Sequence, residues 1–159
     1  RALAARAHAG GGRVALDLGQ ASGDLWRLDE LDDLREALDL LIGNAHEVEL
    51  LLGAPYELAR DGLRSAYEGP VVVKRGRDGA TLDLDAHTPP ADVPAARVNA
   101  VNPVGAGDAF DAGLLAAWCS GRTLLDAVRF ACAVGAASVA SPEGPQGVTR
   151  RAVDELLQE

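Results

Sequence analysis

The sequence is organised around residues 101–110, which read Val-Asn-Pro-Val-Gly-Ala-Gly-Asp-Ala-Phe. This stretch combines a proline-marked exit from a predicted strand, two glycines separated by one alanine, and a carboxylate at the start of an apolar helix. The start of a helix presents unpaired N–H groups and the positive end of the helix dipole. Small residues allow an anion to approach those groups closely. The stretch therefore predicts an anion-binding turn between a strand and a helix.

Asp108 places a negative charge in this turn, where a phosphate is expected. Because a carboxylate repels phosphate, a role as the base for an attacking hydroxyl explains Asp108 better than a role in binding. The alternative is a plain strand-to-helix connection, in which Asp108 favours the helix dipole by roughly 0.3–1 kcal/mol. The two spaced glycines favour the phosphate interpretation, because each costs chain entropy that packing does not return.

The composition is that of one soluble globular domain. At 159 residues the chain can bury a sizeable core, about 70% of its unfolded surface. The net charge of −9 argues against non-specific binding to nucleic acid. No apolar run reaches the roughly 18 residues of a membrane span, and no stretch resembles a signal peptide. Cys119 and Cys132 lack zinc-type spacing and are predicted to be reduced core thiols in a cytoplasmic protein.

Helical and strand patterns alternate along the chain. Helices are predicted over residues 2–9, 28–40, 45–52, 56–67, 105–120, 122–140 and 149–157. Strands are predicted over residues 13–18, 40–43, 70–74, 80–84 and 98–101, with a tight turn at 77–79 and a surface loop over 85–96. This alternation predicts an α/β sandwich with a mostly parallel sheet. Ligands bind such sheets at the carboxyl ends of the strands, so candidate sites follow Ile42, Val73 and Val101.

Two of these strand ends carry polar residues that allow two interpretations each. Asn44 and Glu47 have the spacing of a helix capping box, and they could also present oxygen atoms to a magnesium-bound phosphate, through water. Residues 74–79 could form a hairpin turn with solvated charges. They could also form a nucleotide loop, in which Gly76 and Gly79 bring the backbone close and Lys74 or Arg75 offsets phosphate charge.

Two predicted helices near the carboxyl end carry rows of small residues. The first row consists of Ala109, Ala112, Gly113 and Ala116, and the second of Ala131, Val134, Gly135 and Ser138. Such rows predict close packing of the two helices, and they could also leave a slot for a flat base. His8, His46 and His87 are isolated from one another in the sequence, and no catalytic or metal role is expected for them.

Together these motifs resemble the carboxy-terminal half of the ribokinase-like (PfkB) carbohydrate kinases. Residues 102–110 are similar to the second signature of that family, Asn44-x-x-Glu47 to its Asn-x-x-Glu motif, and residues 74–79 to its nucleotide loop. The resemblance implies a three-layer α/β/α sandwich with a mostly parallel sheet. Residues 1–159 would then be the carboxy-terminal nucleotide-binding and catalytic part of a single kinase domain, without the amino-terminal half and its lid.

The resemblance also implies an enzyme that transfers phosphate from ATP to a hydroxyl of a sugar, sugar phosphate or nucleoside. Asp108 would be the catalytic base. The anion hole would be formed by the N–H groups of Gly105, Ala106 and Gly107. Asn44 and Glu47 would organise Mg²⁺ and the phosphates of ATP. The other nucleotide contacts would come from Lys74, Gly76, Gly79, Gly107, Cys132 and Gly135.

Two departures from the family pattern affect the expected cofactors. Asn102-Pro103 stands where members commonly have Asp-Thr, so a monovalent-cation site, which the resemblance would otherwise imply beside ATP and Mg²⁺, is less expected. Cys132 stands where some members have asparagine near the adenine, which removes one hydrogen-bonding group.

Family members are considerably longer than this chain, and their amino-terminal half carries most contacts to the acceptor. The expected partner is therefore a small-molecule acceptor, with no nucleic acid and no membrane. A strand edge near residues 14–18 would lack its neighbour, which predicts a homodimer or a need for the complementary half. The alternative function is a catalytically inactive nucleotide-binding fragment or pseudokinase.

Overall fold

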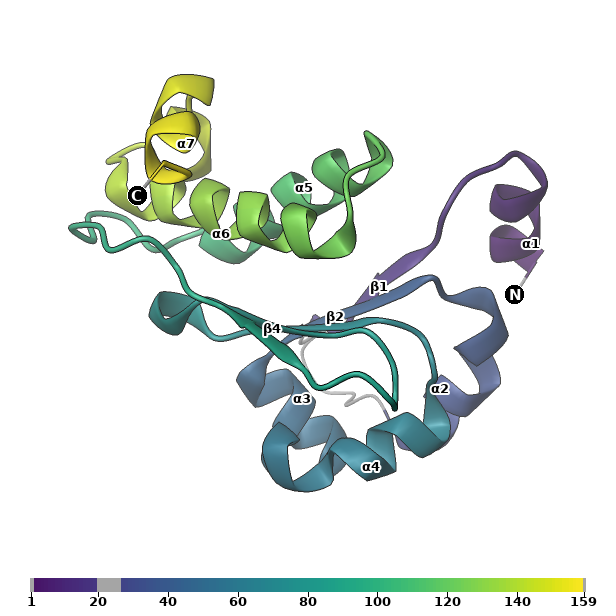
Figure 1. Cartoon of the computed structure of the whole chain (residues 1–159). Helices are drawn as coiled ribbons and strands as arrows, with labels where there is room; N and C mark the ends of the chain where they lie inside the picture. Colours follow the sequence, from purple (N-terminus) through teal and green to yellow (C-terminus); the bar gives the residue numbers. More distant parts are fainter. Residues whose placement is uncertain (1, 20–26, 159) are drawn as a thin grey trace. The chain divides into compact units, whose positions relative to one another are not determined.

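Figure 1 shows the computed structural model of the chain, which describes residues 2–19 and 27–158. The chain folds into two compact units. The first unit comprises residues 1–74 and 83–91, and the second unit comprises residues 75–82 and 92–159. The chain therefore passes from the first unit to the second, back to the first and again to the second.

Within the described residues, five strands form one sheet in the order β1-β2-β3-β4-β5. Their bounds are β1 (Ala15–Asp17), β2 (Leu40–Asn44), β3 (Val71–Lys74), β4 (Ala80–Asp83) and β5 (Ala91–Val93). β2 pairs in parallel with both β1 and β3, with Asp17 opposite Ile42 and Asn44 opposite Lys74. The apolar residues of β2 and β3 are fully buried, as expected of parallel strands. The predicted α/β fold with a mostly parallel sheet is confirmed.

The helices of the first unit are α1 (Ala2–Ala9), α2 (Leu28–Leu34), α3 (Ala45–Leu52) and α4 (Tyr56–Ala66). α2, α3 and α4 lie on one face of the strands (Figure 1), where Leu31, Val48 and Leu63 form a buried cluster with Leu41 and Val73. The predicted helix over residues 28–40 is too long. The observed α-helix ends at Leu34. The chain then forms the 3-10 helix η1 (Arg35–Ala37), because it must become extended before β2 begins at Leu40.

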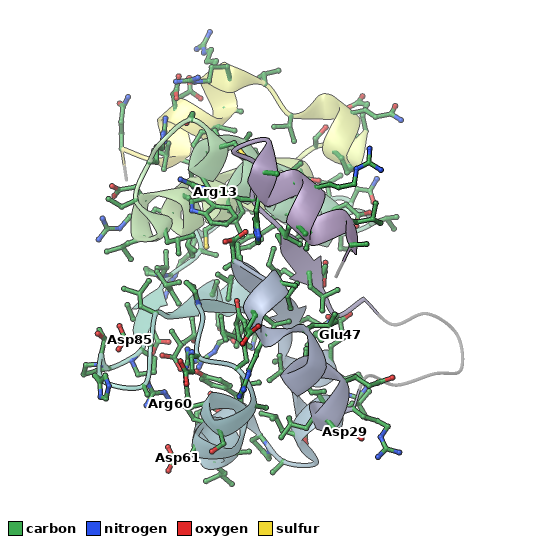
Figure 2. All side chains as sticks on the ribbon, turned by 90° about the vertical axis from the view of Figure 1, so that its right-hand side faces the viewer. Arg13, Asp29, Glu47, Arg60, Asp61 and Asp85 are labelled. Atoms are coloured by element: carbon green, nitrogen blue, oxygen red, sulfur yellow. The ribbon has the colours of Figure 1, made fainter. Side chains whose placement is uncertain are left out.

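A buried carboxylate, Asp83, ties α4 to the end of β4. Its side chain is 0% exposed and accepts hydrogen bonds from Arg60 at 2.7 Å, Arg64 at 3.1 Å and the Tyr56 hydroxyl. Arg60 also donates to the Asp85 carbonyl at 2.7 Å; both residues lie at one side of the first unit in Figure 2. Such a carboxylate is stable in the interior only while its cationic partners remain.

The second unit contains α5 (Ala106–Cys119), α6 (Leu124–Ala140) and α7 (Arg150–Leu156), with the 3-10 helices η2 (Gly76–Asp78) and η3 (Gly144–Gly147). α5 and α6 run side by side (Figure 1). A Cβ at Gly113 would lie 2.9 Å from Val134 Cγ2 and 3.3 Å from Ala131 Cα, so the helices meet too closely for a side chain there. The predicted close packing of the two small-residue rows is confirmed.

The predicted strand over residues 98–101 is wrong. Residues 94–100 have no regular secondary structure, and the Val101 side chain is 52% exposed. The N–H groups of Val101 and Asn102 both donate to the Val139 carbonyl, at 2.9 and 3.0 Å, so this segment is held by the end of α6. The β-branched residues of the segment give it the pattern of a strand, but it is not assigned as a strand because, across the described part of the chain, it lacks hydrogen-bonded pairing with a neighbouring strand.

Two further predictions need correction. The surface loop predicted over residues 85–96 contains β5, in which Val93 is buried. The tight turn predicted at 77–79 is confirmed between the neighbouring strands β3 and β4, where η2 is followed by Gly79 with φ 97°. Cys119 is exposed rather than in the core, whereas Cys132 is buried as predicted; both are free thiols. Among the described residues, no helix is long and apolar enough to cross a membrane.

Candidate active site

Gly105 directly precedes α5 and gives the turn its shape. It occupies the N-cap position with φ 76°, a left-handed conformation that favours glycine. A Cβ at this position would also lie 2.7 Å from Pro145 Cγ. The Ala106 N–H donates to the Pro103 carbonyl at 3.3 Å, and the Ala109 N–H donates to the Gly105 carbonyl at 2.9 Å. The turn is therefore tight, and both the backbone conformation and the packing at position 105 favour glycine.

Gly107 and Asp108 lie in the first turn of α5 and are both exposed. A Cβ built on Gly107 would meet no atom within 4 Å, so the space beside this residue is open. Within the described residues, the N–H groups of Gly107 and Asp108 donate to no backbone carbonyl. The helix start therefore offers two hydrogen-bond donors, the positive end of the dipole and an exposed carboxylate, which suits both anion binding and proton acceptance.

Gly135 and Cys132 lie on α6. A Cβ at Gly135 would be 3.5 Å from the Ala106 carbonyl oxygen and 3.6 Å from Phe110 Cβ, so Gly135 allows α6 to pass close to the start of α5. The Cys132 sulfur lies 3.9 Å from the Val93 carbonyl oxygen. Burial raises the pKa of the Cys132 thiol to about 11, which keeps it protonated and unreactive near neutral pH.

The two glycines of the loop after β3 have different surroundings. Gly79, with φ 97°, packs so tightly that a Cβ would collide with the Val93 carbonyl oxygen and lie 2.6 Å from the Ala95 nitrogen. Gly76, with φ 59°, has open space where its Cβ would be. The loop is closed by a hydrogen bond from the Arg75 N–H to the Gly79 carbonyl at 2.7 Å. Gly79 is thus required by packing, while Gly76 leaves the loop accessible.

In the first unit, Asn44 and Glu47 form the capping box that their spacing predicts. The Glu47 N–H donates to Asn44 Oδ1 at 2.9 Å, and the Asn44 N–H donates to Glu47 Oε2 at 2.7 Å. Both side chains are partly exposed, and the Oε1 oxygen of Glu47 takes part in neither of these two hydrogen bonds. Glu47 is labelled in Figure 2. The capping role is confirmed, and it leaves an oxygen that could serve a hard cation.

Lys74 lies at the carboxyl end of β3, in the same unit as Asn44 and Glu47. Its ammonium is 3.0 Å from Asp17 Oδ2, at the end of β1, and its side chain is 14% exposed. Sequence reasoning did not select Asp17 as a site residue. The signal was present, since Asp17 ends a predicted strand just as Lys74 does, and parallel strands bring their carboxyl ends to one edge.

The structure divides the predicted site residues between the two units. Asn44, Glu47 and Lys74 belong to the first unit. The second unit contains Gly76, Gly79, Gly105, Ala106, Gly107, Asp108, Cys132 and Gly135. Among the described residues, no three or more His, Cys, Asp or Glu side chains gather as a metal site.

Comparison with known proteins identifies the class. The family described as pfkB family carbohydrate kinase matches residues 1–148. The ATP-dependent ribose-1-phosphate kinase of Halopiger xanaduensis is 33% identical over 161 residues, covering 99% of this chain and 50% of that protein. The nucleoside kinase of Methanothermobacter thermautotrophicus is 32% identical over 135 residues, covering 84% of this chain and 41% of that protein.

The fold shows the same relationship. The structure of Arabidopsis thaliana ribokinase complexed with ribose and ATP matches with a TM-score of 0.81 and 24% identity, over 99% of this chain and 51% of that one. The fold is therefore ribokinase-like, as predicted. The chain belongs to the PfkB family of carbohydrate kinases. It spans about half the length of the relatives it matches.

Proposed function

We propose that residues 1–159 form the nucleotide-binding and catalytic part of a kinase domain that transfers phosphate from ATP to a hydroxyl of a sugar, sugar phosphate or nucleoside. The main observation behind this proposal is the exposed Asp108 carboxylate at the start of α5, next to Gly107, where a Cβ would meet no atom within 4 Å. Membership of the PfkB family supports the reaction class. The names of the two relatives, a ribose-1-phosphate kinase and a nucleoside kinase, support the class of acceptor.

Asp108 acts as the base in this proposal. Phosphoryl transfer has a loose transition state, in which the nucleophile needs positioning more than early deprotonation. An exposed carboxylate can orient the acceptor hydroxyl and take its proton late in the step. The N–H groups of Gly107 and its neighbours Gly105 and Ala106 hold the transferred phosphoryl group, and the helix dipole favours its charge. Ala106 contributes less, because its N–H already donates to Pro103.

Glu47 and Asn44 suit Mg²⁺ as oxygen donors on a capped helix, where their positions are fixed. Bound Mg²⁺ neutralises phosphate charge and usually keeps several waters, so one or two protein oxygens are enough. Lys74 supplies a further positive charge to the phosphates. Its ammonium lies 3.0 Å from Asp17 Oδ2, so the positive charge is held at the carboxyl end of β3.

The remaining nucleotide contacts come from Gly76, Gly79, Cys132 and Gly135. Gly76 and Gly79 shape the loop after β3, and Gly135 keeps α6 free of a side chain beside Ala106. Cys132 presents an uncharged thiol, which suits an apolar base better than a phosphate. The proposal includes no monovalent cation, because Asn102 already joins the turn before α5 to the Pro142 carbonyl by a hydrogen bond of 3.0 Å.

The test is the substitution Asp108→Asn in the full-length protein, with ATP and a panel of ribosides and sugar phosphates as acceptors. The kcat is expected to fall by at least about 100-fold, because general-base catalysis contributes roughly 10²–10⁴-fold. Asp61→Asn is the matched control: it removes the same charge from an exposed position on α4 (Figure 2). A kcat of Asp108→Asn within about threefold of this control would refute the role of Asp108.

A further inference from the structure

The Asn102 side chain joins the turn before α5 to the loop after α6. Its Oδ1 accepts a hydrogen bond from the Val104 N–H at 3.1 Å, and its Nδ2 donates to the Pro142 carbonyl at 3.0 Å. Only this orientation of the carboxamide satisfies both partners, because the reversed amide would set oxygen against oxygen and N–H against N–H. The bridge therefore needs an amide and not only a polar side chain.

The two bridged segments are packed so closely that glycine is required on both sides. A Cβ at Gly144 would lie 3.2 Å from Asn102 Nδ2 and 3.3 Å from the Val104 carbonyl oxygen. On the other side, a Cβ at Gly105 would lie 2.7 Å from Pro145 Cγ. Both glycines have positive φ angles, 61° at Gly144 and 76° at Gly105. The carboxamide thus lies within a close-packed junction.

Apolar packing contributes little to the position of this turn. Val101 and Val104 are 52% and 75% exposed. The Val101 and Asn102 N–H groups anchor the segment further, through their hydrogen bonds to the Val139 carbonyl. Hydrogen bonds to the end of α6 and to the loop that follows it therefore hold the turn, while packing against α6 holds α5 itself.

We propose that Asn102 is a positioning residue for phosphoryl transfer: its carboxamide fixes the start of α5 and so directs the Asp108 carboxylate. This inference rests on the proposed function of Asp108. The Asn102 side chain holds Val104, which directly precedes the N-cap residue Gly105, and Asp108 lies in the first helical turn. A misplacement of about 1 Å can cost about 100-fold in rate, so the effect should fall on kcat rather than on the KM for ATP.

The test is Asn102→Asp in the full-length protein. Aspartate retains the acceptor for Val104, but its second carboxylate oxygen would face the Pro142 carbonyl and be repelled by it. The kcat should fall about 10- to 100-fold, with the KM for ATP within about twofold. The loss relative to the wild type should shrink as the pH is lowered from about 8 to about 5, because repulsion by the Pro142 carbonyl raises the pKa of the introduced carboxyl above the ordinary value of about 3.9, and its protonated form can again donate to Pro142. A purely structural defect would not recover in this way.

Asn99→Asp is the matched control, since it makes the same change at an exposed position in the same segment. Kinetics of Asn102→Asp within about threefold of this control at every pH would overturn the proposal. If circular dichroism shows that Asn102→Asp does not fold, Asn102→Ala replaces it. A lower kcat with a nearly unchanged KM for ATP then supports the proposal. An unchanged kcat, or a loss of ATP affinity as large as the loss of kcat, overturns it.

The two proposals fail in different ways. An active Asp108→Asn variant would refute the proposed function. An inactive Asp108→Asn variant together with a fully active Asn102→Asp variant would refute only the positioning role of Asn102.

Discussion

The Lys74 ammonium lies 3.0 Å from the Asp17 carboxylate, an ion pair that joins the ends of the two strands flanking β2. The Lys74 side chain is largely buried, with 14% exposed, whereas the Asp17 side chain is 38% exposed. Asn44 ends the strand between them. A lysine held in place at this edge can interact with a phosphate without first losing much side-chain entropy.

Lys74→Ala should therefore weaken nucleotide binding. We expect the KM for ATP to rise about 5- to 20-fold, with a smaller change in kcat, because the lost charge acts on bound phosphate both before and during transfer. Initial rates at varied ATP concentration measure this. Arg77→Ala is the control, because Arg77 is a cation of the neighbouring loop whose side chain is 95% exposed. Equal effects of the two substitutions would contradict a specific role for Lys74.

Glu47→Gln separates the capping role of Glu47 from its proposed role toward Mg²⁺. Glutamine can still accept a hydrogen bond from the Asn44 N–H, so the melting temperature should change by less than about 3 °C. The loss of the negative charge should raise the Mg²⁺ concentration needed for half-maximal activity about tenfold. Magnesium titrations of the rate test this, beside thermal denaturation. Unchanged dependence on Mg²⁺ would leave Glu47 with a capping role alone.

Asp83→Asn should destabilise the protein by about 3–5 kcal/mol, because it leaves the Arg60 and Arg64 guanidinium groups beside a neutral, buried side chain. Burial acts to raise the pKa of Asp83, but hydrogen bonds from Arg60, Tyr56 and Arg64 outweigh it and hold the pKa below its ordinary value. A lowered pKa in the folded state gives stability that is present above the unfolded pKa, about 3.9, and is lost as the pH falls through the folded value.

Urea unfolding as a function of pH measures both parts of this prediction. Below about pH 4 the free energy of unfolding should fall more steeply for the wild type than for Asp83→Asn. Asp61→Asn, which changes an exposed carboxylate on α4, serves as the control. Parallel pH profiles for the wild type and Asp83→Asn would contradict a stabilising role for the charged form of Asp83.

Gly79→Ala should cost more stability than Gly76→Ala. Both glycines have positive φ angles, so each substitution carries about 1 kcal/mol of backbone strain. Only at Gly79 would the new Cβ also collide with the Val93 carbonyl and the Ala95 nitrogen. We expect the additional cost to exceed about 1 kcal/mol by denaturant unfolding. Similar costs at the two positions would show that the segment after β5 can move away from the loop.

The sequence predicted well the helices whose ends are set by capping residues. The bounds of α3 follow from the Asn44 cap and from Gly53, and Thr149 caps α7 as predicted. β5 was missed because Pro89, Pro90 and an aspartate obscure its short pattern. Pairing decides whether a β-branched segment becomes a strand, and pairing is not visible in the segment itself.

In the candidate site, too, short motifs were predicted from the sequence and contacts between distant residues were not. Its motifs are short runs, so the residues from Gly105 to Asp108 and the pair Asn44 and Glu47 could be selected from the sequence. The bridge from Asn102 to Pro142 could not, because the two residues are 40 positions apart. The ion pair of Asp17 with Lys74, 57 positions apart, was missed although both residues lie at the carboxyl ends of parallel strands.

The central claim is that Asp108 acts on the acceptor hydroxyl and not on the nucleotide. The most direct measurement is single-turnover phosphoryl transfer by Asp108→Asn in the full-length protein, together with the Kd for ATP. We expect the transfer rate to fall at least about 100-fold while the Kd stays within about threefold. A transfer rate close to that of the wild type, or a loss of ATP binding as large as the loss of rate, would contradict it.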